Sequence, residues 1–413
     1  MRIAVVGAGV SGLVAAHRLR ARHDVVLFEA QDRLGGHAHA HDVTVDGRAF
    51  RLDTGFLVFN EPAYPHFTAL LAELGVPSQP SDMSLSIRCR RCRLEYALRG
   101  PAALLAQPTN LLRPSFLAIF RDLFRFFREA NAWLDAGGDD VPLRAFLARG
   151  RYGAPFVRHW LLPTAGAVWS SPFGGILDFS TRMLLTFFRN HGFLQRKQRP
   201  WRHVAGGSRA YVDALGARLG GAVRLSSPVR RVTRHDAGVL VEAGGRTPER
   251  FDAVVLACHA DEAAAVLADA SSEEARLLGR FPYARHRVVL HTDRSFLPRS
   301  PRAWASWNCD VIDCHDEEAP VGVTYHLNRL QSLDDAVPFC VTLNPDRTPN
   351  GVLRDLAYAH PTLTSDAVAA QAALAALSGT RGTWFAGAHL RHGFHEDGVV
   401  SALRVATALG CAP

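Results

Sequence analysis

Short apolar runs, each ending at glycine or a polar turn, recur along the chain and predict buried strands alternating with helices. The clearest runs are residues 3–6, 25–28, 251–257 and 383–387, and a helix is expected over 398–409. Runs of this length that alternate with helical patterns are typical of a mostly parallel sheet. The pattern therefore predicts an α/β fold.

The turn after the first strand carries Gly7, Gly9 and Gly12. Such glycines allow a tight turn, a close approach of backbone N–H groups to a pyrophosphate, and close packing of helix on strand. Glu29 closes the second strand about 20 residues on, where an acidic side chain accepts from a ribose hydroxyl. These features predict a dinucleotide site. A secretory signal and a ligand-free glycine turn are the alternatives, and His23–Val26, which continues into a strand, argues against the signal.

The strand patterns divide the chain into separated pieces. Residues 1–75, 201–262 and 382–413 are expected to form one discontinuous Rossmann-like nucleotide-binding domain. The two insertions, 76–200 and 263–381, are rich in aromatic residues, arginine and proline and are expected to form an α+β substrate or cap domain. A length of 413 residues is enough for two domains with their own cores.

Residues 115–133 have the pattern of an amphipathic helix, with Arg121, Arg125 and Arg128 on its polar half. Its apolar half contains Phe116, Ile119, Phe120, Leu123, Phe124, Phe126 and Phe127. One interpretation is a helix packed on the cap domain, and the other is a helix lying in a membrane interface. A basic, aromatic stretch over 187–201 supports the second interpretation.

The composition narrows the setting. The chain has 47 Lys and Arg against 39 Asp and Glu, a net charge of +8, but carries no zinc-finger or RNA-binding signature, so no nucleic-acid partner is predicted. Seven scattered cysteines without a secretory signal indicate a reducing, cytoplasmic setting, with the inner face of the membrane as a possible location. Cys89 and Cys92 have zinc-knuckle spacing, and Cys309, Cys314 and His315 stand far along the chain; without a second pair at finger-like distance, no metal site is predicted. No apolar run is long enough to span a bilayer.

Arg33, Gly35 and Gly36 follow the acidic residue Glu29. Near the C-terminus, the last apolar strand ends in Ala386–Gly387 and is followed by a helix with small residues at its start. With the glycine turn, this set resembles the flavin-containing amine oxidase and phytoene desaturase superfamily. The resemblance covers both ends and the middle strands, and it implies FAD as the cofactor. It also implies FAD contacts from these positions: Gly7, Gly9, Val10, Ser11, Gly12, Glu29, Ala30, Arg33, Gly35, Gly36, His37, Thr54, Gly55, Phe56, Val229, Gly387, Asp397, Gly398 and Val399.

Five phrases are similar to a bacterial branch of FAD oxidoreductases related to the N-terminal domain of plant cyclopropane fatty acid synthases, whose relatives include a furan fatty acid desaturase. The phrases are residues 35–39, 53–60, 304–308, 326–331 and 393–398. This resemblance implies a lipid substrate, a methyl-branched acyl chain of a phospholipid, and a lipid methyltransferase as a possible partner.

The chain departs from the superfamily at three positions. His37 stands where Arg or Lys is common, and Ala388 replaces an acid, which leaves Asp397 or Glu396 to meet the ribitol. His286 stands near the place of a lysine that amine oxidases hold beside flavin N5, which lowers the expectation of amine oxidation.

The remaining predictions concern single groups. The helix opening at Gly398 presents a positive helix end toward the flavin, or is simply an Asp-capped helix. His37, His39 and His41 alternate and are expected to contact flavin or solvent; a metal is the alternative. His395 is the preferred acid–base candidate, ahead of His392.

The function predicted is removal of hydride from an activated C–H bond of a lipid. A flavin amine oxidase and a carotenoid-type polyene desaturase are the alternatives. A further alternative is a non-enzymatic FAD-binding partner of a lipid methyltransferase.

Overall fold

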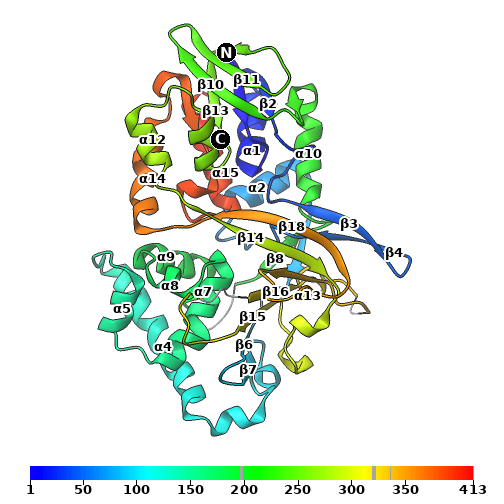
Figure 1. Cartoon of the computed structure of the whole chain (residues 1–413), viewed down its shortest axis with the longest axis vertical. Coiled ribbons are helices and arrows are strands. Elements are labelled where there is room, and N and C mark those ends of the chain that lie inside the picture. Colours follow the sequence, from blue (N-terminus) through cyan, green and yellow to red (C-terminus); the bar gives the residue numbers. More distant parts are fainter. Residues whose placement is uncertain (196–198, 319–321, 335, 413) are drawn as a thin grey trace.

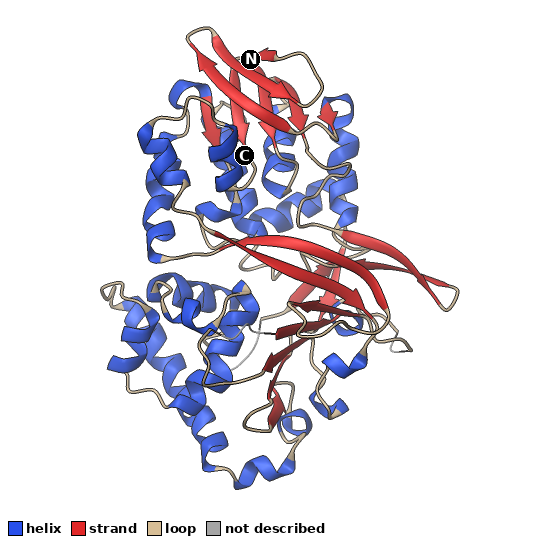
Figure 2. Cartoon of the chain, in the orientation of Figure 1, coloured by secondary structure: helices blue, strands red, loops and turns tan. Residues whose placement is uncertain are grey.

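The computed structural model describes residues 1–195, 199–318, 322–334 and 336–412. Two β-sheets lie one beyond the other along the long axis, each with its own helices (Figure 1). Both chain termini lie in the part that holds the parallel sheet (Figure 1). The mixed arrangement of helices and strands in Figure 2 confirms the predicted α/β class.

The first sheet has five parallel strands. In spatial order they are β19 (Thr383–Phe385), β13 (Ala253–Leu256), β1 (Arg2–Val6), β2 (Asp24–Phe28) and β9 (Val223–Arg224). Alternate residues of β1 enter different cores: Ile3 and Val5 pack on one face, Ala4 and Val6 on the other. A sheet covered on both faces has continuous apolar strands, which is why the sequence shows unbroken apolar runs here.

Helices and a small antiparallel sheet cover these two faces. One core is formed with α1 (Val10–Leu19), α2 (Pro65–Leu74), α10 (Arg209–Leu219) and α15 (His395–Ala408). The other core is formed with β10 (Val229–His235), β11 (Gly238–Ala243), β12 (Glu249–Phe251), α11 (Ala260–Val266), α12 (Ser272–Leu278) and α14 (Ser365–Leu377). Thus α12 and α14, which belong to the range predicted for the cap, pack with the parallel sheet.

The predicted strand over 251–257 is two strands in two different sheets. The chain changes sheet at Asp252, whose carboxylate accepts the backbone N–H of Arg2 at 2.6 Å. An apolar run alone does not show such a break, because Phe251 at the end of β12 is buried like all four residues of β13.

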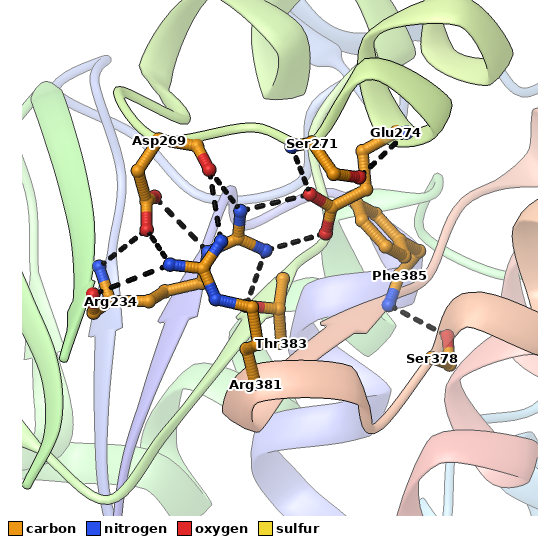
Figure 3. A network of polar contacts seen from close by, with 8 residues as sticks. All are labelled: Arg234, Asp269, Ser271, Glu274, Ser378, Arg381, Thr383 and Phe385. Carbon is orange, nitrogen blue, oxygen red and sulfur yellow. Dashed lines mark hydrogen bonds and ion pairs between the residues drawn. The ribbon is translucent and has the colours of Figure 1, made fainter. Parts of the chain in front are cut away.

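A buried ion pair joins the small sheet to the helices beyond it (Figure 3). The guanidinium of Arg234 on β10 donates to both carboxylate oxygens of Glu274 on α12 and also to Asp269. The side chains of Arg234 and Glu274 are only 1% and 4% exposed. Arg381, next to β19, binds the same Asp269 (Figure 3). Removing one partner would leave a buried charge, so this network fixes α12 and the segment before β19 against β10.

The second sheet has seven strands, antiparallel except where β15 runs parallel to β6. In spatial order they are β18 (Val352–Pro361), β14 (Tyr283–His291), β17 (Cys340–Leu343), β16 (Gly322–His326), β15 (Trp307–Val311), β6 (Leu85–Cys89) and β7 (Leu94–Ala97). Two further pairs are β3 (Ala40–Val45) with β4 (Arg48–Asp53), and β5 (Ser78–Ser81) with β8 (Trp201–Val204).

Helices drawn from residues 101–191 pack beside this sheet (Figure 1). They are α3 (Pro101–Leu104), α4 (Pro114–Asp135), α5 (Leu143–Arg149), α6 (Ala154–Phe156), the π-helical turn Val157–Leu161, α7 (Leu162–Trp169), α8 (Phe173–Leu177) and α9 (Thr181–His191). The short helix α13 (Leu327–Leu330) lies next to β16.

The amphipathic helix is α4, and most of its apolar half is buried. Phe116, Ile119, Leu123 and Phe126 belong to the core of the second domain, so the packing interpretation is confirmed for these residues. Phe124 remains 47% exposed. Within the described residues, no helix combines the length and apolarity needed to cross a bilayer.

Several aromatic residues of the second basic stretch lie in the core. Phe187, Phe188 and Trp201 are buried, because they pack into the core shared by α9 and β8. Its basic centre, residues 196–198, lies outside the described residues.

Candidate functional site

The glycine turn after β1 serves three separate purposes. Gly7 has φ of 96°, and a Cβ there would stand 2.8 Å from the Ala257 carbonyl oxygen. A Cβ on Gly12 would stand 1.8 Å from the Gly7 carbonyl oxygen, so this glycine is required for helix α1 to pack on the turn. A Cβ on Gly9 would meet no atom within 4 Å, because it would point into open space. The turn is therefore a cradle whose open side is at Gly9.

Glu29 directly follows β2 and holds this turn in shape. Its Oε2 accepts the backbone N–H of Ala8 at 2.7 Å, and its Oε1 accepts that of Gln31 at 2.8 Å. A carboxylate with two oxygens retains further lone pairs for a ribose hydroxyl.

The second glycine pair closes the cradle from the other side. Gly36, with φ of 58°, is so close to the turn that its Cβ would stand 3.0 Å from the Cα of Gly9. Gly35 donates its N–H to the Ala8 carbonyl at 2.9 Å. The guanidinium of Arg33 donates to the Gly36 carbonyl at 3.0 Å and so fixes the loop.

A cavity of about 1090 Å³ begins at this cradle and continues to the second sheet. It exceeds the roughly 300–1,000 Å³ of ordinary small-molecule sites, so a cofactor and a substrate fit together. Of the predicted cofactor residues, the following line it: Gly7, Gly9, Val10, Ser11, Glu29, Ala30, Arg33, Gly35, Gly36, His37, Gly55, Phe56, Val229 and Gly387. Residues from all three pieces of the first domain therefore meet at one cavity.

The two ends of the cavity differ in chemistry. Its lining carboxylates, Glu29, Asp261 and Glu262, follow β2 or lie on α11, at the dinucleotide end. The end formed by the second domain is lined by apolar and aromatic side chains: Leu57, Val58, Tyr64, Met83, Val168, Trp169, Phe187, Phe193, Trp201, Trp307, Tyr325 and Leu356. No carboxylate of the described residues lines this aromatic end.

Histidines gather between the two ends. Burial lowers the pKa of His37 to about 4 and that of His39 to about 3. The Nε2 atom of His37 is buried and has no hydrogen-bond partner in the described structure. His39 bonds to the Tyr358 hydroxyl at 3.0 Å. These imidazoles are neutral at physiological pH and offer hydrogen bonds, not charge, to a bound group.

His395 lines the cavity at the start of α15, three residues before the predicted helix start. Its Nε2 bonds to the Tyr211 hydroxyl at 2.7 Å. Burial lowers its pKa to about 3, which makes it a poor proton carrier near neutral pH. Phe394 and His395, at the start of α15, lie on the cavity wall.

Asp397, Gly398 and Val399 do not line the cavity. Asp397 accepts the backbone N–H of Phe394 at 2.9 Å and caps α15, which is the alternative the sequence left open. A Cβ on Gly398 would stand 2.7 Å from Val10, so this glycine allows α15 to approach α1. Glu396, the other candidate for ribitol, is buried and caps α2 instead through the N–H groups of His66 and Phe67.

Thr54 and His286 also lie away from the cavity wall. The Thr54 hydroxyl bonds to Tyr358 at 2.7 Å and so supports the residue that does face the cavity. On β14, Tyr283 and Arg285 line the cavity while His286 is turned to Asn344, because neighbouring strand residues point to opposite faces. His286 was predicted to lie beside the flavin, but its neighbour Arg285 is the residue that faces the cavity.

Sequence reasoning missed the strand that supplies most of the central wall. Residues 356–361 of β18 all line the cavity, including Tyr358 and His360. Their signal, alternation of larger residues with alanine over 356–360, is too short to separate from an ordinary strand.

Comparison with known proteins gives the family. The profile of flavin-containing amine oxidoreductases matches residues 10–356, most of the chain. The chain belongs to this family, whose members contain flavin. The glycine cradle, Glu29 and the volume of the cavity fit FAD as its cofactor.

The curated relatives are similar over part of their length. The chain is 30% identical over 251 residues to AofH of Mycobacterium tuberculosis, which bears the name of a flavin-containing monoamine oxidase. That match covers 58% of this chain and 53% of AofH, so the chain spans about half the length of this relative. Protoporphyrinogen oxidase 2 of Arabidopsis thaliana is 34% identical over 135 residues, 32% of this chain and 24% of that protein.

Solved structures share the whole fold. Cyclohexylamine oxidase from Brevibacterium oxydans has a TM-score of 0.73 at 17% identity and covers 99% of this chain and 98% of its own. A fatty acid isomerase from P. acnes has a TM-score of 0.67 at 18% identity and covers 98% of both. At these identities the likeness shows the fold alone.

Proposed function

We propose that the protein is an FAD-dependent oxidoreductase that removes hydride from an activated C–H bond of a lipid acyl chain. The observation that carries this proposal is the aromatic end of the cavity, which has no carboxylate among its described residues. A soluble amine is positively charged at neutral pH and would find no counter-ion there. An uncharged acyl chain would bury its surface against these rings.

FAD, when bound, supplies the hydride acceptor of the reaction. The glycine cradle would hold its pyrophosphate, and Val229, at the open end of a β-bulge, would meet its adenine through the backbone. His37 donates to the Ala359 carbonyl through its other ring nitrogen, so its unpartnered buried Nε2 would accept a hydrogen bond from the bound group. The aromatic rings exclude water, which keeps the reaction free of competing hydrolysis and proton leakage.

Tyr325 and His191, which both line the cavity, are poorly suited to strong base catalysis. Burial raises the pKa of Tyr325 far above its ordinary value of 10.0 and lowers that of His191 to about 4. Both therefore stay neutral, and the substrate must carry a C–H bond already activated by a neighbouring double bond. This favours an unsaturated acyl chain, in agreement with the methyl-branched chain implied by the sequence resemblance.

An exposed apolar patch offers a means of reaching lipid. Leu111, Leu112, Leu117 and Phe124 are 51%, 84%, 52% and 47% exposed, at or just before α4; we name them the α4 patch. A groove beside it is lined by Arg121, Arg125 and Arg128, whose guanidinium groups suit lipid phosphates. The patch would place the protein at an anionic membrane surface, where a lipid methyltransferase would be a natural partner.

A flavin amine oxidase is the second candidate, because the family profile and AofH carry that name. Lys197 is the single lysine of the sequence, and it lies outside the described residues. The amine oxidase candidate therefore has no described lysine to place beside the flavin.

Anaerobic mixing of the FAD-loaded protein with candidate substrates separates the two. Vesicles of phospholipid with methyl-branched unsaturated chains are expected to bleach the flavin, and unbranched saturated vesicles are the matched control. Bleaching by small amines without lipid would overturn the lipid proposal, and no bleaching by either class would favour a scaffold role.

A further inference from the structure

Four metal-ligating side chains meet in the second domain, and none of them lines the cavity. They are Cys89 at the end of β6, Cys92 in the turn to β7, His159 in the π-helical turn Val157–Leu161, and Cys314 after β15. One ligand atom from each lies within 4.8 Å of the other three. These are the ligand types of structural zinc sites.

The spacing of the sulfurs suits a shared ion. The Sγ atoms of Cys92 and Cys314 are 3.5 Å apart, against about 2.05 Å in a disulfide. Sulfurs bound to one tetrahedral zinc at about 2.3 Å stand roughly 3.8 Å from each other. The backbone N–H of Cys92 also donates to Sγ of Cys89 at 3.4 Å.

His159 supplies an independent observation. Its side chain is buried, 8% exposed, and its Nε2 has no hydrogen-bond partner in the described structure. The imidazole has the Pro155 carbonyl as its hydrogen-bond partner, which must be met by Nδ1 because Nε2 is unpaired. A backbone carbonyl on one ring nitrogen and a metal on the other is the usual arrangement of a zinc-bound histidine. A buried imidazole nitrogen left without a partner is otherwise costly.

We propose that the protein binds one structural Zn²⁺ through the thiolates of Cys89, Cys92 and Cys314 and the Nε2 of His159. Three sulfurs and one nitrogen fill a tetrahedral coordination shell, so no position is left for a substrate. Soft thiolates exclude Ca²⁺ and Mg²⁺ as the natural occupant. Cys92 is exposed and gives the ion access from solvent, while the other three ligands are buried.

The sequence could not place this site, because its ligands come from three distant segments. Cys309 and His315 are the residues of metal-ligating type next to Cys314 in the sequence, but neither belongs to the cluster. Cys309 contacts the Pro163 carbonyl, and His315 faces Arg158. The fourth ligand is His159, whose position in the sequence carries no signal.

The ion would add to contacts that already join these parts, among them the Arg91–Asp313 ion pair and the pairing of β6 with β15. It would join the β6–β7 turn at the edge of the sheet to the loop after β15 and to the helical layer that begins at α6. That helical layer continues into α7, whose Val168 and Trp169 line the aromatic end of the cavity. The expected effect is therefore on the stability of the substrate domain.

The direct test is metal analysis of the FAD-loaded protein, purified under thiol reductant and freed of loose metal by brief chelation. About one zinc per chain is expected, and X-ray absorption at the zinc edge is expected to show three sulfurs near 2.3 Å and one nitrogen near 2.0–2.1 Å. Cys92→Ala and His159→Gln are expected to lose at least tenfold in zinc affinity. Cys340→Ala, another buried cysteine on β17, is the matched control and should keep its zinc.

Three results would overturn the proposal. One is wild-type protein that holds no zinc, both as purified and after incubation with Zn²⁺ under reductant. Another is a Cys92–Cys314 disulfide found by mass spectrometry in protein kept under reductant. The third is equal zinc loss in Cys340→Ala and Cys92→Ala. Because Cys92 is exposed, its variant is expected to fold, which keeps the comparison informative even if His159→Gln does not.

Discussion

The imidazole of His395 lies flat against the phenyl ring of Phe56, with ring centroids 3.7 Å apart and planes 8° apart. One residue comes from the first piece of the discontinuous domain and the other from the last. The Tyr211 hydroxyl, from the middle piece, holds the imidazole Nε2 at 2.7 Å. Three distant segments are thus joined on the cavity wall, and His395 positions that wall without carrying protons.

We therefore expect His395→Phe to keep most of its activity. The stack on Phe56 is retained, and only the bond to Tyr211 is lost, so the rate of flavin reduction should fall by less than about tenfold. Loss of a general acid or base costs about 10²–10⁴-fold. Rapid-mixing absorbance of the flavin measures the rate, and Tyr211→Phe is the control for the lost hydrogen bond. A loss above a hundredfold with an altered pH profile would restore His395 as an acid–base group.

Gly9→Ala and Gly12→Ala should fail in different ways. The Cβ on Gly9 enters the space of the cradle, so this variant should fold normally but bind FAD at least about tenfold more weakly. The Cβ on Gly12 meets the Gly7 carbonyl, so this variant should lose about 1–3 kcal/mol or more of folding free energy. Flavin titration and thermal unfolding separate the two effects. Equal FAD affinity in Gly9→Ala and wild type would contradict the placing of the pyrophosphate.

These glycines show what the sequence could predict. Their roles depend on neighbours within one strand–turn–helix unit, so the spacing of Gly7, Gly9 and Gly12 was sufficient. Thr54 and Asp397 also stand at plausible positions, but their polar groups are satisfied by Tyr358 and Phe394. Such hydrogen bonds join segments that only tertiary packing brings together, and the same limit hid His159 and Cys314.

Acid should destabilise the protein. Burial lowers the pKa of His191 and His291 to about 4, and that of His389 and His395 to about 3. Unfolded histidines take up protons below their ordinary pKa of 6.5, so the folded state is fully favoured above 6.5 and loses stability as pH falls toward 4.

One buried carboxyl works against this trend. Burial raises the pKa of Asp53 from 3.8 to about 6, so its contribution declines as pH rises through that range. The four histidines outweigh the one carboxyl. The midpoint temperature of thermal unfolding should therefore decrease as the pH is lowered from 7 to 4. Thermal unfolding at constant ionic strength measures it. A midpoint that is level or rises over this range would contradict the buried, neutral state of the histidines.

The α4 patch should control membrane binding. Leu112→Glu with Leu117→Glu places charge on two exposed apolar positions and is expected to lower flotation with anionic vesicles at least about fivefold. Ile312→Glu with Val352→Glu is the matched control, because these side chains are 38% and 42% exposed elsewhere on the surface. Equal flotation of both double variants would show that the α4 patch does not bind the vesicles.

The most direct measurement of the central claim is the absorbance of the bound flavin after anaerobic mixing with defined lipid. The account predicts that phospholipid with methyl-branched unsaturated chains bleaches the flavin in a saturable way, and that small primary amines at equal concentration do not. Bleaching by the amines with no response to any lipid would contradict it.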